Sequence, residues 1–125
     1  MLQEIYIIDD QTNLIKNLKE LFHTDKEYRF INVHSDRVEQ ALKNIPNLII
    51  IHEDNLHQDA VEICKRVRED EDNSITPIIV ISSNKEHKHR IEMLQLGISH
   101  YIVAPIDQEF LYYTIKNIIR LMYVN

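Results

Sequence analysis

The stretch NLIIIHEDNLHQDAVEIC, residues 47–64, decides the fold. Residues 48–51 form an unbroken, mostly β-branched apolar run that is too short for a helix and too apolar on both faces for a half-exposed strand. The run therefore predicts a central strand of a parallel sheet. Because ligands of open α/β sheets bind beyond the carboxyl ends of such strands, the next residue, His52, is expected at the functional end of the fold.

Strands and helices are predicted to alternate on both sides of this run. The other strands are expected at residues 5–8, 28–34, 78–81 and 101–103, and the second of them alternates enough to lie at a sheet edge. Helices are expected from Thr12 or Asn13, over residues 38–45 behind a capping box of Asp36 and Glu39, from Gln58 or Asp59, from Lys85 to Leu96, and from Asp107 to Met122. Gly97 is expected to end the fourth helix in the left-handed conformation.

Four of the helices carry an apolar stripe at helical spacing, which is expected to be buried. These residues are Leu14, Ile15, Leu18, Leu21 and Phe22; Val38, Ala41, Leu42 and Ile45; Ala60, Ile63, Cys64 and Val67; and Leu111, Ile115, Ile118, Ile119 and Met122. Since crossovers between parallel strands are right-handed, the pattern predicts an α/β fold with a doubly wound, five-stranded parallel sheet. The expected strand order is 2-1-3-4-5 with helices on both faces, in a single domain over residues 1–125.

Composition excludes several classes of function. The net charge is −6 and the 14 Lys and Arg residues are scattered, so nucleic acid is a poor partner for this domain. The first residues do not resemble a signal peptide, and no apolar run is long enough to span a membrane. Gly97 is the only glycine, which leaves neither a Walker loop nor a GxGxxG turn. The single cysteine, Cys64, predicts a buried, reduced thiol in a cytoplasmic protein.

Three further stretches point to a family. Asp9 and Asp10 follow the first strand, TPIIVISS (76–83) ends on the hydroxyls after the fourth, and GISHYIVAP (97–105) carries Tyr101 and Pro105. In this order and spacing the chain resembles, over essentially its whole length, the receiver domain of bacterial two-component response regulators. The resemblance implies a flavodoxin-like fold, a switch pair of Ser82 and Tyr101, and a cis peptide bond before Pro105.

The chain departs from this family at two positions. The resemblance places His52 where the family has its nucleophilic aspartate and Ala104 where it has a lysine. An imidazole cannot form the acyl phosphate, and a methyl group cannot neutralise an incoming oxyanion. The pocket of Asp9, Asp10, His52, Ser82 and Ala104 is therefore interpreted as degenerate, without catalytic residues. Such a pseudo-receiver is not an enzyme, has no cofactor, and binds Mg²⁺ weakly or not at all.

Alternative readings of these acids stay open. Asp54 lies two residues past His52 and shares its side of an extended strand, so Asp54 or Asp10 is an alternative phosphate acceptor. Asp9, Asp10, His52 and Asp54 are also weak candidates for a metal site, with His57 as a further ligand. A simpler interpretation, which we favour, is that His52 forms a hydrogen bond to one carboxylate. The charge of its protonated ring would then substitute for that of the missing lysine.

A pair of histidines and an alternative class of protein are also considered. His87 and His89 lie two residues apart on a helix and are expected on its solvated face. A flavin carrier on the same fold is disfavoured because Asp9 and Asp10 would repel the phosphate of the cofactor.

The expected function is a receiver-like signalling module that acts through protein–protein contacts, independently of phosphorylation. The contact face is expected to combine the helix from Lys85 to Leu96, the strand with Tyr101 and the helix from Asp107 to Met122. The last helix carries apolar residues beyond its core stripe, namely Phe110, Tyr112, Tyr113, Leu121 and Tyr123. Expected partners are signalling proteins, a C-terminal output domain of the diguanylate cyclase or DNA-binding type, or a second copy of the chain. Because the last helix ends without a polar tail, the chain is expected to be a domain cut from a longer regulator.

Overall fold

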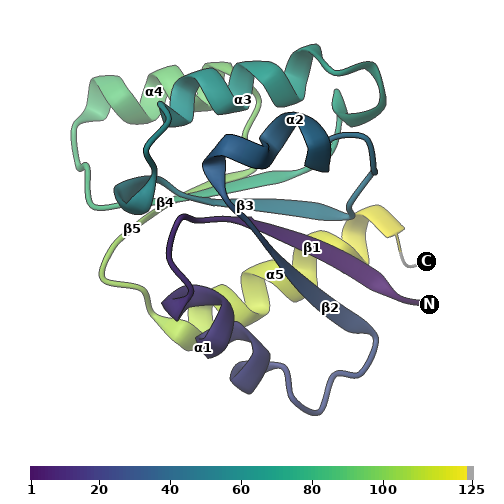
Figure 1. Cartoon of the computed structure of the whole chain (residues 1–125). Helices are drawn as coiled ribbons and strands as arrows, with labels where there is room; N and C mark the ends of the chain where they lie inside the picture. Colours follow the sequence, from purple (N-terminus) through teal and green to yellow (C-terminus); the bar gives the residue numbers. More distant parts are fainter. Residues whose placement is uncertain (124–125) are drawn as a thin grey trace.

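A five-stranded parallel sheet forms the middle of the computed structural model, which describes residues 1–123 (Figure 1). Its strands are β1 (Gln3–Ile8), β2 (Tyr28–Val33), β3 (Leu48–His52), β4 (Ile78–Ser82) and β5 (His100–Val103). They lie in the order β2-β1-β3-β4-β5, and every neighbouring pair is parallel. The predicted fold class and strand order are confirmed, with β2 at one edge.

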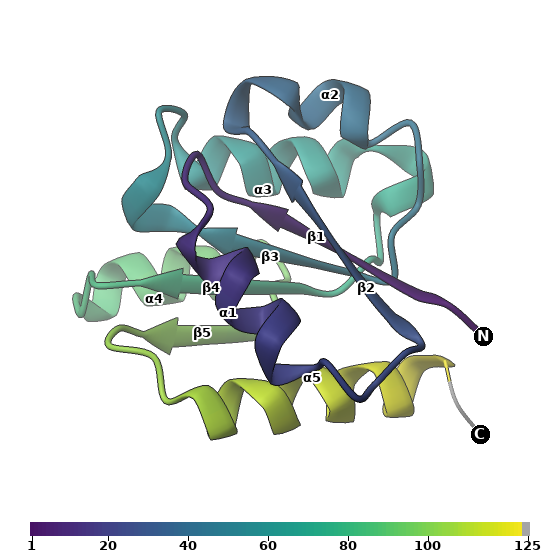
Figure 2. The same ribbon diagram turned by 60° about the horizontal axis from the view of Figure 1, so that its bottom comes forward.

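Helices cover both faces of this sheet (Figures 1 and 2). They are α1 (Asn13–Leu21), α2 (Val38–Ala41), α3 (Ala60–Glu69), α4 (His87–Gln95) and α5 (Gln108–Tyr123). Helices α1 and α5 pack on one face, whereas α2, α3 and α4 pack on the other. Three short 3-10 helices join these elements: η1 (Ser35–Arg37), η2 (Glu53–Asn55) and η3 (Glu71–Asn73).

Strand β3 has the burial that its sequence predicts. Ile49 and Ile51 belong to the core under α2, α3 and α4, and Leu48 and Ile50 belong to the core under α1 and α5. All four are 0% exposed, because the strand has a neighbour on each side and helices above and below. The strand then ends on His52, which is therefore held at the carboxyl edge of the sheet.

The second helix is shorter than the sequence predicts. Residues 35–37 form a 3-10 turn, and the Nδ1 atom of His34 accepts the Asp36 amide at 3.1 Å. The predicted capping box of Asp36 and Glu39 is therefore wrong, because Asp36 lies inside a turn that another side chain caps. Helix α2 ends at Ala41, and Ile45 is 61% exposed instead of buried.

The last helix confirms most of its predicted stripe. Four of the five residues are buried, but Met122 is 46% exposed. The last turn of α5 reaches the amino-terminal end of β3, where the Tyr123 hydroxyl donates to the Asn47 carbonyl at 2.8 Å. Met122 lies in this last turn, and the prediction of its burial is wrong.

Two smaller predictions are confirmed. Gly97 follows α4 with φ of +80°, and the guanidinium of Arg68 donates to the carbonyls of Leu96 and Gly97 at this turn. Cys64 is 0% exposed, and burial raises the pKa of its thiol to about 12, which makes it unreactive. Within residues 1–123, no helix combines the length and apolar character needed to cross a membrane.

Candidate functional site

The carboxyl ends of the strands bring the predicted pocket residues to one edge of the sheet. Asp9 and Asp10 follow β1, His52 ends β3 and Ser82 ends β4. Ala104 follows β5, and its amide donates to the Ser82 carbonyl at 2.9 Å. The Ala104–Pro105 peptide bond is cis, the geometry expected from the sequence.

Asp9 and His52 form the centre of this edge. Asp9 is 0% exposed, and its Oδ2 atom lies 2.9 Å from Nδ1 of His52, whose side chain is 17% exposed. The other carboxylate oxygen, Oδ1, accepts the Gln11 amide at 2.9 Å. The imidazole thus provides the polar partner that a buried carboxylate requires, in the arrangement that the simpler reading of His52 expects.

Asn55 is a third member of this group, and the sequence reasoning missed it. Its Nδ2 atom donates to Oδ1 of Asp9 at 3.1 Å and lies 3.1 Å from Nδ1 of His52. The turn of η2 folds the Asn55 side chain back toward the end of β3. Nothing in the linear sequence marks this residue, since an asparagine after two acids is typical of an ordinary turn.

Asp10 faces away from His52 and toward the loops after β2 and β3. Its side chain is 6% exposed and accepts the Ser35 amide at 2.7 Å, the Ser35 hydroxyl at 2.8 Å and the His57 amide at 2.7 Å. Burial disfavours the carboxylate, but these hydrogen bonds outweigh it, so that the pKa of Asp10 lies below its ordinary value. Asp10 is therefore a fixed anion at this edge.

The carboxylate oxygens of Asp9 and Asp10 already have polar partners within the chain. Here protein N–H or O–H groups, or the His52 ring, already point at both oxygens of Asp9 and both oxygens of Asp10. Strand β3 ends on the imidazole of His52.

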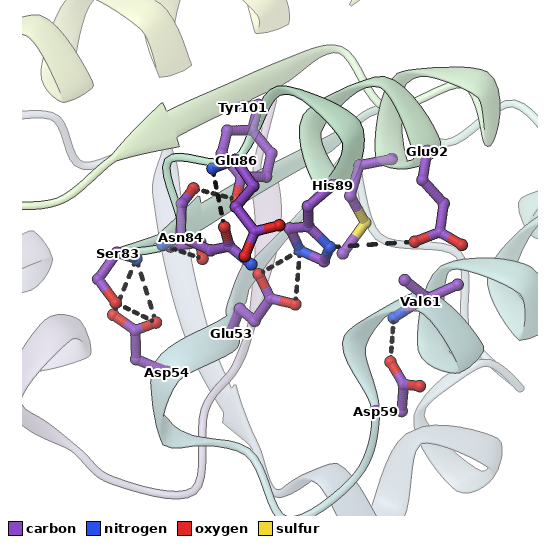
Figure 3. A network of polar contacts seen from close by, with 12 residues as sticks. Glu53, Asp54, Asp59, Val61, Ser83, Asn84, Glu86, His89, Glu92 and Tyr101 are labelled. Carbon is purple, nitrogen blue, oxygen red and sulfur yellow. Dashed lines mark hydrogen bonds and ion pairs between the residues drawn. The ribbon is translucent and has the colours of Figure 1, made fainter.

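Asp54 binds the loop that follows β4, as Figure 3 shows. Its Oδ1 atom accepts the amide of Ser83 at 3.1 Å and the hydroxyl of the same residue at 3.0 Å. Ser82, one residue earlier, accepts the Asn84 amide on its hydroxyl oxygen at 3.0 Å. The β4–α4 loop is thus held by a carboxylate that belongs to the chain itself.

Glu53 reaches helix α4 from the same turn (Figure 3). The Nε2 atom of His89 lies 2.8 Å from Oε1 of Glu53, and the two side chains are 17% and 19% exposed. The prediction that His89 lies on a solvated face is wrong, because η2 reaches over this part of α4; His87 is exposed as expected.

Tyr101 packs beside His89. Its ring lies edge-on to the His89 ring, with centroids 5.9 Å apart, and its hydroxyl donates to the Asn84 carbonyl at 2.7 Å. Burial raises the pKa of the Tyr101 phenol. The two residues of the predicted switch pair, Ser82 and Tyr101, are therefore joined through contacts with one residue of the β4–α4 loop, Asn84.

Replacing Glu53 by glutamine is expected to lower the free energy of unfolding by about 1–2 kcal/mol, because a mostly buried hydrogen bond to a carboxylate becomes a weaker one to a neutral amide. Urea denaturation followed by circular dichroism measures the loss. Glu92→Gln is the matched control, since Glu92 is 57% exposed and lies 3.9 Å from the same imidazole. Its effect should stay within about 0.5 kcal/mol. Equal effects of the two substitutions would show that the Glu53 contact adds no stability.

Comparisons with known proteins agree with this geometry. A family model for the response regulator receiver domain matches residues 5–116. The response regulator ArlR of Staphylococcus haemolyticus is 31% identical over 117 residues, which cover 93% of this chain and 52% of that protein. The chain thus spans about half the length of the curated relatives it matches.

Solved structures show the same fold. A signal receiver domain of a histidine kinase from Clostridium thermocellum superposes with a TM-score of 0.84 at 19% identity, covering 96% of this chain and 99% of that one. A two-component response regulator from Clostridium difficile superposes with a TM-score of 0.81 at 24% identity, covering 97% and 98% of the two chains.

Proposed function

Because the chain belongs to the response regulator receiver domain family, we propose that it is a receiver of two-component signalling that acts through protein contacts without being phosphorylated. The single observation that carries this proposal is the contact between Asp9 and His52. The ring stands at the end of β3, where the resemblance requires a nucleophilic carboxylate. An imidazole there cannot become an acyl phosphate, and it occupies one oxygen of the neighbouring acid.

The other acids of the edge are poorly suited to replace the missing acceptor. Asp10 is 6% exposed and accepts three hydrogen bonds, and both oxygens of Asp54 accept from Ser83. Ala104 brings no cation to neutralise an incoming phosphoryl group. Phosphorylation at Asp54 or Asp10 is therefore the less favoured function, and we propose that the chain is not an enzyme.

The face for partners is proposed to lie on α4, β5 and α5. Large apolar side chains are exposed along both helices, including Phe110 at 53%, Tyr113 at 56% and Leu121 at 85% on α5. On α4, Ile91 is 37% and Leu94 is 43% exposed. Exposed apolar side chains of this size are typical of a contact surface when they form a patch.

The relatives suggest what covers this face. They are response regulators about twice as long as this chain, so a further domain is one candidate. We propose a C-terminal output domain of the DNA-binding or diguanylate cyclase type, or a separate signalling protein, as the partner. A second copy of the chain would use the same face.

The test is a binding measurement with the partner isolated from the source organism. Replacing Phe110 and Tyr113 by serine is expected to weaken binding at least tenfold, or about 1.4 kcal/mol, because each ring is large and apolar. A small phosphodonor with magnesium should leave the affinity of the wild-type chain unchanged.

The control is Ile75→Ser, which alters a side chain that is 80% exposed in the loop before β4 and should bind like wild type. The proposal fails if the phosphodonor shifts the affinity. It also fails if the double variant binds as tightly as the control.

A further inference from the structure

We propose that Asp10, His34 and His57 form a binding site for one divalent transition-metal ion of the zinc class. The three residues come from the ends of three segments: the loop after β1, the loop after β2 and the loop after β3. One ligand atom of each lies within 4.8 Å of the others. Among residues 1–123, these three residues are the one group of three or more His, Cys, Asp or Glu side chains whose ligand atoms lie close enough to share an ion. The site shares Asp10 with the degenerate pocket, but it does not depend on the proposed signalling function.

The two imidazoles converge on a single carboxylate. The Nδ1 atom of His34 lies 3.5 Å from Oδ1 of Asp10, and Nε2 of His57 lies 3.9 Å from Oδ2. The centroids of the two rings are 5.6 Å apart. These distances exceed those of hydrogen bonds, so the rings approach the acid without being fixed to it. A small inward movement would bring all three groups to the metal–ligand distances that zinc requires.

The carboxylate of Asp10 is held in place by its surroundings. The amide and hydroxyl of Ser35 and the amide of His57 bond to it at 2.7–2.8 Å and fix its orientation. Such supporting hydrogen bonds are a regular part of metal sites. Oδ1 accepts only the Ser35 amide, whereas Oδ2 accepts two hydrogen bonds, so Oδ1 keeps a lone pair for an ion that takes one oxygen and two nitrogens.

The histidines have the freedom that a ligand needs. The His57 side chain is 75% exposed and the His34 side chain is 41% exposed, so water can complete the coordination. Nδ1 of His34 accepts the Asp36 amide at 3.1 Å, so an ion bound to this atom would displace that hydrogen bond. A carboxylate oxygen of Asp36 lies 3.6 Å from the same ring and adds negative charge. A cation is thus favoured over an anion here.

This set differs from the metal candidates that the sequence suggests. His52 is turned toward Asp9, and Asp54 is bound to Ser83, so neither faces the two exposed rings. Asp10 alone is common to both sets. An ion bound by Asp10, His34 and His57 would tie together three loops at the edge of the sheet, and it would stabilise the fold in proportion to its concentration over its dissociation constant.

The test is a zinc titration of the apo chain by calorimetry, with Co²⁺ as a second probe whose visible absorption reports coordination by protein nitrogens. Wild type is expected to bind one ion per chain. His57→Ala retains the backbone amide that bonds Asp10 and should still fold. This substitution is expected to weaken zinc binding by at least about 10- to 100-fold. Loss of a residue that only supports a metal ligand already has an effect of this size. His34→Ala should weaken binding similarly.

His100→Ala is the matched control, because this histidine is exposed at the start of β5 and lies outside the site. Its affinity should equal that of wild type. The proposal is wrong if the zinc titration of wild type does not saturate at one ion per chain. It is also wrong if zinc binds His57→Ala and His34→Ala as tightly as it binds His100→Ala. The second result would mean adventitious binding to surface histidines.

Discussion

Asp9→Ala is expected to lower the free energy of unfolding by about 3 kcal/mol, because it removes a buried, hydrogen-bonded carboxylate and leaves the polar groups around it without a partner. The carboxylate is 0% exposed, and its three neighbours His52, Asn55 and Gln11 would each lose an acceptor. Urea denaturation at neutral pH measures the change. Asp9→Asn keeps an acceptor oxygen and should cost less.

The control for this prediction is Asp72→Ala, which removes an exposed acid of η3 and should stay within about 0.5 kcal/mol of wild type. A double-mutant cycle of Asp9→Ala with His52→Ala isolates the pair, and the coupling should exceed about 1 kcal/mol. If Asp9→Ala instead stabilises the chain, repulsion between Asp9 and Asp10 outweighs the contact with His52.

Introducing the two groups that the proposed function holds to be missing is expected to turn the pocket into an acceptor. In His52→Asp/Ala104→Lys, a carboxylate oxygen at the end of β3 can attack the phosphorus of a small phosphodonor while the donor's leaving group departs. The lysine then neutralises the oxyanion, and Asp9 is freed from the imidazole. Incubation with magnesium and the donor should add one phosphoryl group, which intact mass spectrometry detects.

Each single variant is a control for this gain. Ala104→Lys alone should remain unmodified because it still lacks the nucleophile, and His52→Asp alone should react more slowly than the double variant because it lacks the cation. A folded double variant that never gains a phosphoryl group would show that the pocket has lost more than these two side chains. The interpretation of His52 and Ala104 as the decisive changes would then be wrong.

The sheet could be predicted because its signals are local. The apolar run of residues 48–51 is long enough for a strand and too short for a helix, so its burial on both faces follows from the sequence. Two other signals are also local. Gly97 takes the left-handed conformation after α4, and Asp59 caps the first turn of α3. Strand order then follows from the handedness of the crossovers.

Contacts between loops could not be predicted in the same way. The pair of Glu53 and His89 joins residues 36 positions apart, and the approach of His34 and His57 to Asp10 depends on two independent turns. The capping box at Asp36 was a local signal that failed, because the side chain of His34 caps a 3-10 turn there. Sequence periodicity says which elements form, whereas these contacts depend on how the elements are placed.

The measurement that tests the central claim most directly is incubation of the unaltered chain with a small phosphodonor, magnesium and beryllofluoride, followed by intact mass and NMR. With an imidazole at the end of β3 and no lysine beside it, the mass should not change, and the amide signals of Ser82 and Tyr101 should stay where they are. A covalent gain of one phosphoryl group, or a shift of those two signals, would contradict the claim that this receiver works without phosphorylation.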